Sequence, residues 1–320
     1  MPDIAALPPV VAISGPTAAG KSSLALALCE RLQGGAEIVS VDSAQIYRGM
    51  DIGSAKPDAA TQARVPHHLI DILDPAQAYS AARFADDATR AIEAIRGRGR
   101  IPVLVGGTLL YFRALFAGLS DLPSADPALR RELEAERLAR GAEAQHARLA
   151  AVDPVTAARL HPNDAQRVQR ALEIFQLSGR PASEWHADPK AEPRIAGRVL
   201  RHAVMPPEKA SFDRRIAARF EQMIGQGLVD EVARLRARGD LHLDLPSMRA
   251  VGYRQIWQHL DGRHGLAEAV KLGIYATRQY AKRQMTWLRG EGGWSWIDAG
   301  EPAAVDAVLR SIGSPSAAVG

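Results

Sequence analysis

A glycine-rich loop between a strand and a helix is the feature that most constrains how this chain can fold. Residues 15–22 read Gly-Pro-Thr-Ala-Ala-Gly-Lys-Ser and match the phosphate-binding pattern G-x-x-x-x-G-K-[ST]. The loop follows a β-branched apolar run at 10–13 and precedes a segment at 23–32 with leucines at helical spacing. Since chance seldom supplies both flanks, the pattern favours phosphate binding over a plain structural turn.

Each part of this loop suits the binding of phosphate. Glycines let the backbone wrap one anion with several N–H groups, and the following helix adds the favourable end of its dipole. A lysine supplies a point charge, and a serine hydroxyl is a ligand that a phosphate-bridging Mg²⁺ accepts. We therefore predict a phosphate site formed by Gly15, Pro16, Thr17, Ala18, Ala19, Gly20, Lys21 and Ser22, with Ser22 as the metal ligand.

Further strands and helices alternate after the loop. Apolar runs at 37–41 and 101–105 predict strands, and a helical pattern at about 81–96 lies between them. This alternation predicts an α/β fold, with a P-loop NTPase-like parallel sheet flanked by helices. In such sheets ligands bind beyond the carboxyl ends of the strands, where Asp42 and Thr108 are expected.

The sequence pattern changes from alternating strands and helices to helices alone from about residue 121. Three helical patterns follow with no strand between them, at 127–151, 154–160 and 164–178. A returning strand and two long helices are then expected, at 199–204, 212–238 and 266–289. The chain is thus predicted to contain a catalytic core (1–120 and 199–313), an inserted all-helical subdomain (121–198) and a flexible tail (314–320).

Asp42 is the acidic residue best placed to act in the predicted site. The strand at 101–105 ends in Gly-Gly-Thr and lacks the carboxylate with which a P-loop NTPase normally holds its Mg²⁺. At the end of the strand at 37–41, Asp42 could be a metal ligand, a general base or the N-cap of the next segment. Its position opposite a phosphate loop favours the first two roles over the cap.

Positive charge gathers late in the chain. Forty basic and 36 acidic residues give a net +4, which genome composition explains as well as a polyanionic partner does. The stretch 249–289, however, contains eight Lys or Arg residues against Asp261 and Glu268, a balance of +6. The rest of the chain is slightly acidic, so this stretch is a candidate surface for nucleic acid. The aromatic residues of this stretch are Tyr253, Trp257, Tyr275, Tyr280 and Trp287, and most of these five are expected in the core.

Five blocks of the sequence together resemble the bacterial tRNA dimethylallyltransferase family. In that family's order, the chain carries GPTAAGKS at 15–22, DSAQIYRGMDIGSAKP at 42–57, VGGT at 105–108, RAVGYRQ at 249–255 and KRQMTW at 282–287. The resemblance extends from about residue 10 to 290 and is far more specific than the phosphate loop alone. Ser22 and Ser54 stand where threonine is expected more often, and Ala19 where serine is common, which leaves the chemistry intact.

The resemblance implies a prenyl transfer. A dimethylallyl group moves from dimethylallyl diphosphate to the exocyclic amine of the adenosine 3′-adjacent to the anticodon in tRNA, and diphosphate leaves with the help of Mg²⁺. The loop at 15–22 then holds a diphosphate, Asp42 accepts the amine proton, and Thr108 orients the adenine. Arg219 is implied to reach the diphosphate, with Arg214 and Arg215 as competing candidates and a solvated helix face as the alternative for all three.

The resemblance also implies contacts with the anticodon stem-loop of tRNA. The target base must leave its stack to reach a pocket, so base flipping is expected. Taken by itself, the helical segment 166–170 could equally be a solvated face. The implied tRNA-binding residues are Asp42, Ser43, Ala44, Gln45, Thr108, Arg130, Gln166, Arg167, Val168, Gln169, Arg170, Arg249, Gly252, Tyr253, Arg254, Lys282, Arg283, Gln284, Trp287 and Arg289.

Three rival functions remain open at this level. A P-loop small-molecule kinase would bind ATP and release a phosphorylated product. A prenyltransferase acting on free adenine nucleotide would need neither a basic RNA surface nor a helical insertion. A non-enzymatic RNA-binding protein would leave Lys21 and Asp42 without a role.

Composition sets the broad class of the protein. With 47% hydrophobic and 24% charged residues, the chain has the balance of a soluble globular protein. No run of 18 apolar residues predicts a membrane helix, and the N-terminus does not resemble a signal peptide. The single cysteine, Cys29, fits a reducing compartment, so we expect a cytoplasmic protein, and we expect it to be a monomer.

Overall fold

The computed structural model describes residues 7–33, 35–188, 193–300 and 303–313. The chain divides into two compact units, one comprising 1–116 with 194–320 and the other comprising 117–193. The tail expected to be flexible, 314–320, lies outside the described residues. No helix in the described part of the chain is long and apolar enough to cross a membrane.

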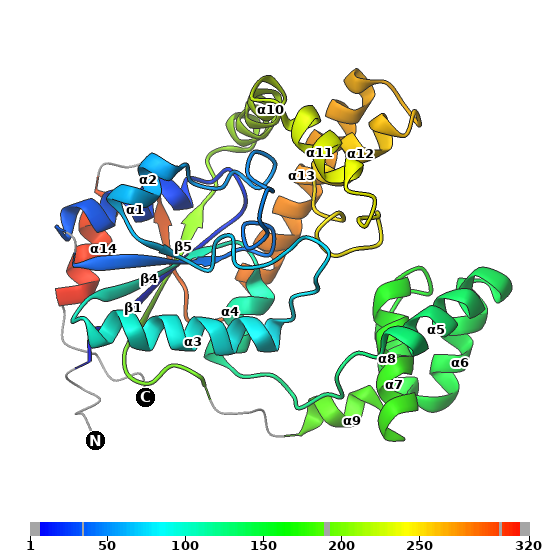
Figure 1. The fold of residues 1–320 in the computed structure, drawn as a ribbon. Coiled ribbons are helices and arrows are strands. Elements are labelled where there is room, and N and C mark those ends of the chain that lie inside the picture. The colour runs from blue at the N-terminus through cyan, green and yellow to red at the C-terminus, as the bar shows by residue number, and fades with distance from the viewer. Residues whose placement is uncertain (1–6, 34, 189–192, 301–302, 314–320) are drawn as a thin grey trace. The chain divides into compact units, whose positions relative to one another are not determined.

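The larger unit is built around a six-stranded parallel sheet (Figure 1). The strand order is β3-β2-β4-β1-β5-β6, so β1 lies between β4 and β5, and its Ser14 pairs with both Gly106 and Ala203. The α/β fold with a parallel sheet is therefore confirmed. The strands are β1 (Val10–Ser14), β2 (Ala36–Val41), β3 (His67–His68), β4 (Ile101–Gly106), β5 (Val199–Met205) and β6 (Ser295–Asp298).

Helices cover both faces of this sheet. Figure 1 shows α1 and α14 on one face and α3 and α4 on the other, as expected for a sheet whose strands are buried on both sides. The helices of this unit are α1 (Lys21–Arg31), α2 (Ala59–Arg64), α3 (Ala81–Gly97), α4 (Leu109–Phe116), α10 (Lys209–Gly225), α11 (Leu228–Ala237), α12 (Tyr253–Leu260), α13 (Leu266–Gly290) and α14 (Ala304–Gly313).

The helix α3 illustrates how local sequence produces this layer. The side chain of Ser80 caps its first turn by accepting a hydrogen bond from the Arg83 N–H at 3.1 Å. Phe84, Ala88 and Ile92 then recur every four residues and are buried. This spacing places one apolar stripe on the helix, which packs against β2 and β4.

A second apolar core lies under the helices α10 to α13. Tyr47 and Met50, from the segment after β2, are buried in it together with Val232, Tyr253 and Trp257. The segment that follows the candidate base Asp42 is therefore held by helices that occur almost 200 residues later in the chain.

The smaller unit contains helices only, within the residues described. Leu133, Leu149, Val168 and Leu172 form its core. Glu173 is also fully buried, and its carboxylate accepts hydrogen bonds from two arginines and a backbone N–H. The helices are α5 (Pro127–Arg140), α6 (Ala142–Val152), α7 (Pro154–Arg159), α8 (Ala165–Ser178) and α9 (Ala182–Ala187).

Two helices predicted as continuous are each interrupted, and both predictions were wrong for the same reason. The pattern at 127–151 divides into α5 and α6 at Gly141, and the pattern at 212–238 divides into α10 and α11 at Gly227. The φ angles of these glycines are +87° and +98°, a region that other residues enter only with strain. A glycine within a helical pattern was the available signal of a break.

Candidate active site

The phosphate loop connects the central strand β1 to the helix α1, as the sequence predicts. The helix begins at Lys21 directly after Gly20, and no side chain in the described part of the chain caps its first turn. The first N–H groups of a helix have no partner within it, so this end is open to an anion. The exposed hydroxyl-bearing residue Ser22 lies in the same turn.

Lys21 is held inside the loop that precedes it. Its Nζ donates a hydrogen bond to the carbonyl oxygen of Pro16 at 2.7 Å. The pKa of Lys21 is lowered to about 7, first by burial and then by the positive charge of Arg219, while the negative charge of Asp42 opposes both. A bound anion would favour the charged ammonium again, so this lysine is placed for an anionic ligand.

Asp42 lies at the carboxyl end of β2 and uses one oxygen to shape the backbone. Its Oδ1 accepts hydrogen bonds from the N–H groups of Ala44 at 2.8 Å and Gln45 at 3.3 Å. The second oxygen, Oδ2, accepts no hydrogen bond from any residue that the structure describes, and Asp42 lines the cavity that contains Lys21. The capping role and a role in the cavity, which the sequence left as alternatives, are therefore compatible.

Thr108 lies beside Asp42 because β2 and β4 are neighbours in the sheet. The Thr108 Oγ1 accepts a hydrogen bond from the Ser43 N–H at 3.1 Å and lies 3.4 Å from the Ser43 Oγ. Its own N–H donates to the carbonyl oxygen of Val41. The two strand ends that the sequence singled out are thus joined by direct hydrogen bonds.

A cavity of about 300 Å³ brings the phosphate loop and Asp42 together, whereas Thr108 does not line it. The phosphate loop, Asp42 and Gln45 line this cavity. Lys21, Ser22 and Arg219 line the same cavity, which therefore combines cationic groups and one carboxylate in a small volume.

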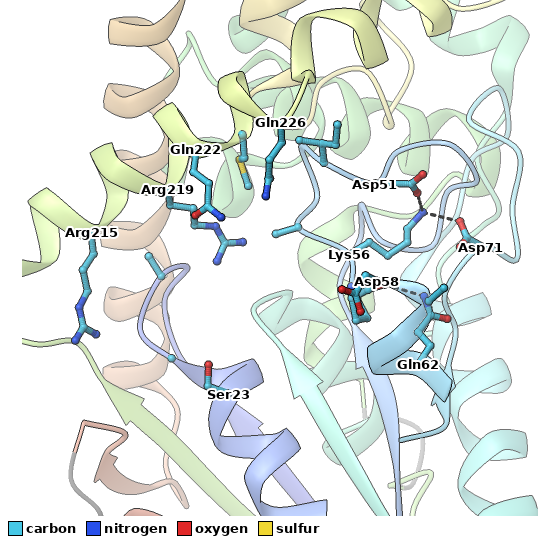
Figure 2. Close-up of a pocket in the computed structure, with 17 residues that line it drawn as sticks. Ser23, Asp51, Lys56, Asp58, Gln62, Asp71, Arg215, Arg219, Gln222 and Gln226 are labelled. Carbon is cyan, nitrogen blue, oxygen red and sulfur yellow. Dashed lines mark hydrogen bonds and ion pairs between the residues drawn. The ribbon is translucent and has the colours of Figure 1, made fainter. Parts of the chain in front are cut away.

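A larger cavity of about 750 Å³ adjoins the first. Figure 2 shows Arg215, Arg219 and Gln222 entering it from α10, opposite Lys56, which bonds to Asp51 and Asp71. The two cavities are contiguous because the same residues line both: Ala18, Gly20, Ser23, Ala55, Pro57 and Arg219.

The structure separates the three candidate arginines. Arg219 is half-buried and lines both cavities, and its guanidinium makes no hydrogen bond within the described ranges of the chain. Burial lowers its pKa, and the charge of Asp42 acts in the opposite sense. Arg215 is exposed and lines only the larger cavity, whereas Arg214 is exposed and lines neither. Arg219 therefore has the best position to reach an anion held by the loop.

Gln284 occupies a place that sequence reasoning did not expect. It was grouped with the tRNA contacts, but only 4% of its surface is exposed. Its Oε1 accepts a hydrogen bond from the Thr17 N–H, and its Nε2 donates to the carbonyl oxygen of Gly107, each at 2.9 Å. The side chain thus connects the phosphate loop to the end of β4.

Tyr280 is a cavity residue that sequence reasoning missed. It lines the 300 Å³ cavity one helical turn before Gln284, and burial together with the nearby charge of Asp42 raises its pKa to about 12. Residues four apart share a helix face, so the position of Gln284 was the signal that could have found Tyr280. Of the aromatic residues expected in the core, Tyr253 and Trp257 are buried, Tyr280 and Trp287 are half-buried, and Tyr275 is 61% exposed.

The predicted tRNA contacts in the late basic stretch divide into exposed and buried positions. Arg249, Arg254, Lys282, Arg283 and Arg289 are exposed. Three of the predicted contacts are buried instead. Gly252 and Tyr253 lie in the core at the start of α12, and Gln284 bonds to the phosphate loop. Trp287 is half-buried beneath the guanidinium of Arg113, which lies 5.9 Å from its ring centroid.

The predicted contacts in the smaller unit also divide. Arg130 and Arg170 both form ion pairs with the buried carboxylate of Glu173, and Gln169 donates to the Arg130 carbonyl at 2.7 Å. Gln166 and Arg167 are exposed, whereas Val168 is buried in the core of this unit. The segment 166–170 therefore presents polar side chains on one face while its apolar side packs inward.

The comparisons with known proteins point to one family. The profile of the family described as IPP transferase matches residues 45–291. A protein of Halorhodospira halophila named tRNA dimethylallyltransferase is 61% identical over 283 residues, which cover 88% of this chain and 90% of that protein. A protein of Alkalilimnicola ehrlichii with the same name is 58% identical over 291 residues, covering 91% and 90%.

Solved structures agree with the sequence comparisons. The full-length tRNA isopentenylpyrophosphate transferase of Bacillus halodurans is 39% identical, covers 96% of each chain and superposes with a TM-score of 0.68. A eukaryotic dimethylallyltransferase acting on tRNA is 26% identical, with a TM-score of 0.76 over 95% of this chain and 77% of the other.

Proposed function

The chain belongs to the IPP transferase family, and from that premise we propose that it is a tRNA dimethylallyltransferase. It transfers a dimethylallyl group from dimethylallyl diphosphate to the exocyclic amine of the adenosine 3′-adjacent to the anticodon in tRNA, and releases diphosphate. The observation that carries this proposal is the 300 Å³ cavity, which the phosphate loop and Asp42 both line. Thr108 bonds to Ser43, the residue that follows Asp42.

The phosphate loop acts on the leaving group. When the allylic C–O bond breaks, negative charge collects on the departing diphosphate, and the groups that face it determine how readily it leaves. Lys21, Arg219 and the open N-terminus of α1 all lie at this side of the cavity. They are in place before the bond breaks, so little rearrangement is needed to stabilise the charge.

Asp42 and Thr108 act on the nucleophile. The adenine amine is a weak nucleophile because its lone pair is delocalised into the ring, and it must lose a proton as its nitrogen bonds to the allylic carbon. The Oδ2 of Asp42 is the acceptor for that proton, while the turn hydrogen bonds hold Oδ1. We propose that the hydroxyl of Thr108, which bonds to the Ser43 N–H, orients the base.

Magnesium fits this site as an ion carried mainly by the substrate. Ser22 and Asp42 are oxygen donors that line the same cavity. No group of three or more His, Cys, Asp or Glu residues in the described part of the chain could hold a metal ion by itself. Mg²⁺ retains waters and binds substrate phosphates with one or two protein ligands, which suits this donor set. When bound, it supplies positive charge to the leaving diphosphate.

The exposed cations are proposed to bind the tRNA backbone. Arg249 and Arg254 flank the start of α12, and Lys282 and Arg283 are exposed on α13. Arg167 offers a further cation on the smaller unit, where its side chain is 74% exposed. A tRNA-modifying enzyme with this chemistry is expected to act in the cytoplasm, and we propose that it acts as a monomer.

A transfer assay with radiolabelled dimethylallyl diphosphate tests this function. The expected result is label in tRNA and none in free AMP. Label in AMP with none in tRNA would favour the free-nucleotide prenyltransferase. A phosphorylated product formed from labelled ATP, with no prenyl transfer, would favour the kinase.

A further inference from the structure

A buried carboxylate on α11 binds the segment that leads to the lining of the 300 Å³ cavity. Glu231, on α11, is only 2% exposed. Its Oε2 accepts hydrogen bonds from the N–H groups of Asp51 at 3.1 Å and Ile52 at 2.8 Å. Its Oε1 accepts from the Gly53 N–H at 3.2 Å and from the Tyr253 hydroxyl at 2.6 Å. Three consecutive backbone N–H groups therefore converge on one side chain.

This carboxylate forms no ion pair with any cation of the described residues. A buried charge is tolerated only when hydrogen bonds replace its hydration, and here four donors do so. Because three of the donors are successive backbone groups, they can converge only if the segment 51–53 keeps one conformation. Glu231 thus specifies the shape of this segment.

Close packing reinforces the same conformation. A Cβ atom on Gly53 would lie 2.6 Å from Cε2 of the Tyr253 ring and 2.9 Å from Cδ1 of Leu228. The backbone at Gly53 therefore lies directly against the ring whose hydroxyl bonds to Glu231. Only glycine allows this approach.

The other end of the segment forms part of the cavity. Ser54, Ala55 and Pro57 line the 300 Å³ cavity. The carbonyl oxygens of Ser54 and Ala55 accept hydrogen bonds from the Gln45 Nε2 at 3.4 Å and 3.2 Å. The Gln45 Oε1 accepts from the Ser40 hydroxyl at 2.8 Å.

Gln45 in turn lies next to the candidate base. Its backbone N–H donates to the Asp42 Oδ1, and its side chain lines the cavity that Asp42 lines. A continuous set of contacts therefore runs from Glu231 through the segment 51–55 to Gln45 and Asp42. The phosphate loop is held separately, by the bond from Thr17 to Gln284.

We propose that Glu231, together with Tyr253, is a positioning residue for the transfer reaction. It holds the segment 51–55 so that Gln45 keeps its place beside Asp42, on the adenine side of the cavity. This inference rests on the function proposed above, and it assigns Glu231 and Tyr253 an effect on the chemical step rather than on the binding of diphosphate.

The test uses the full chain with tRNA and dimethylallyl diphosphate as substrates. Tyr253→Phe removes one hydroxyl and keeps the ring that packs on Gly53; Glu231→Gln removes the charge. Both are expected to lower kcat by roughly 10-fold, because small displacements of reacting groups are costly. KM for dimethylallyl diphosphate should change by no more than about twofold, because a separate hydrogen bond, from Thr17 to Gln284, holds the phosphate loop. A rise in that KM with kcat unchanged would overturn the proposal.

A double-mutant cycle tests whether the effect passes through Gln45. Gln45→Ala is expected to lower kcat, and Tyr253→Phe combined with Gln45→Ala should lower it no further than Gln45→Ala alone. Losses that multiply would mean that the two residues act independently and would overturn the proposal. The Tyr253→Phe variant tests the positioning role even if the Glu231→Gln variant does not fold.

Glu37→Gln is the matched control. Glu37 is also 2% exposed and accepts several hydrogen bonds, but it lies at the amino end of β2 and lines neither cavity. The Glu37→Gln variant should have a lower Tm and an unchanged kcat. If its kcat fell as much as that of Glu231→Gln, the effect of Glu231 would be one of general stability. If the wild-type chain transfers nothing to tRNA, the proposed function is wrong. If the wild-type chain is active but the losses in kcat of Tyr253→Phe and Gln45→Ala multiply, only the positioning role is wrong.

Discussion

The side-chain oxygen of Gln284 accepts a hydrogen bond from the backbone N–H of Thr17, 267 residues earlier in the chain, at 2.9 Å. This contact ties α13 to the phosphate loop. The same helix exposes Lys282 and Arg283, so the element proposed to bind tRNA also supports the loop proposed to hold the diphosphate. Substitutions at neighbouring residues of this helix are therefore expected to affect diphosphate binding and tRNA binding separately.

Gln284→Met should weaken the binding of inorganic diphosphate by roughly 10-fold, because the part-buried Thr17 N–H loses its hydrogen-bond partner. tRNA affinity should change little, since the amide faces inward. Lys282→Met, two residues away and exposed, should show the reverse pattern. Isothermal titration with each ligand measures both, and a large loss of tRNA affinity in Gln284→Met would contradict the inward role.

Asp42→Asn should slow prenyl transfer by roughly 100-fold or more, because the proton acceptor is lost. The asparagine oxygen can still accept from the Ala44 N–H, so the turn and the affinity for tRNA should be retained. Single-turnover transfer and filter binding of tRNA measure the two effects. Near-normal turnover would remove Asp42 from the role of base.

Diphosphate binding should weaken as the pH rises above neutrality. The pKa of Lys21 in the free site is lowered to about 7, first by burial, so its ammonium is present below pH 7 and increasingly lost above it. An anion binds the charged form, so affinity should fall by up to about tenfold per pH unit above 7. Diphosphate titrates as well, so the measurement compares the chain with Lys21→Met between pH 6 and 9. Identical slopes would show that Lys21 does not contribute.

Acid should remove a contribution of Glu37 to stability. Burial alone would raise its pKa, but hydrogen bonds from Arg98, His68 and Arg100 lower it to about 2. A lowered pKa stabilises the fold above the ordinary value of 4.5, and this contribution is lost as the pH falls from about 4.5 toward 2. Its size at neutral pH is roughly 3 kcal/mol by linkage. Urea unfolding of Glu37→Gln should therefore show a flatter pH dependence over this range; an unchanged profile would contradict the assignment.

Reversing the charge of Arg249, Arg254, Lys282 and Arg283 should weaken tRNA binding and flatten its dependence on salt. Each phosphate contact that is lost reduces the slope of log K against log salt by about 0.7 to 0.9. Affinities measured from 50 to 300 mM KCl test this. Reversal of Arg90, exposed on α3, is the control and should leave the slope unchanged. An equal slope in all the proteins would exclude this surface from contact with the backbone.

Much of the site was predictable because its parts are local in the sequence. The phosphate loop needs only a strand, a short run of glycines and a helix, all within 25 residues. Asp42 and Thr108 could be placed because the carboxyl ends of parallel strands share one edge of a sheet, and the structure joins them through Ser43. The helix breaks at Gly141 and Gly227 were missed because an apolar pattern continues across them.

The sequence by itself determined the α/β class, the phosphate loop and the residue types at two strand ends, because strand and helix periodicities and a short motif act over neighbouring residues. The tertiary structure alone decided that Gln284 serves the phosphate loop, that Arg219 rather than Arg214 or Arg215 faces both cavities, and that Glu231 binds the segment 51–53. Those outcomes depend on which face of a helix packs against a loop more than a hundred residues away, and the free energy of that packing is a property of the whole fold.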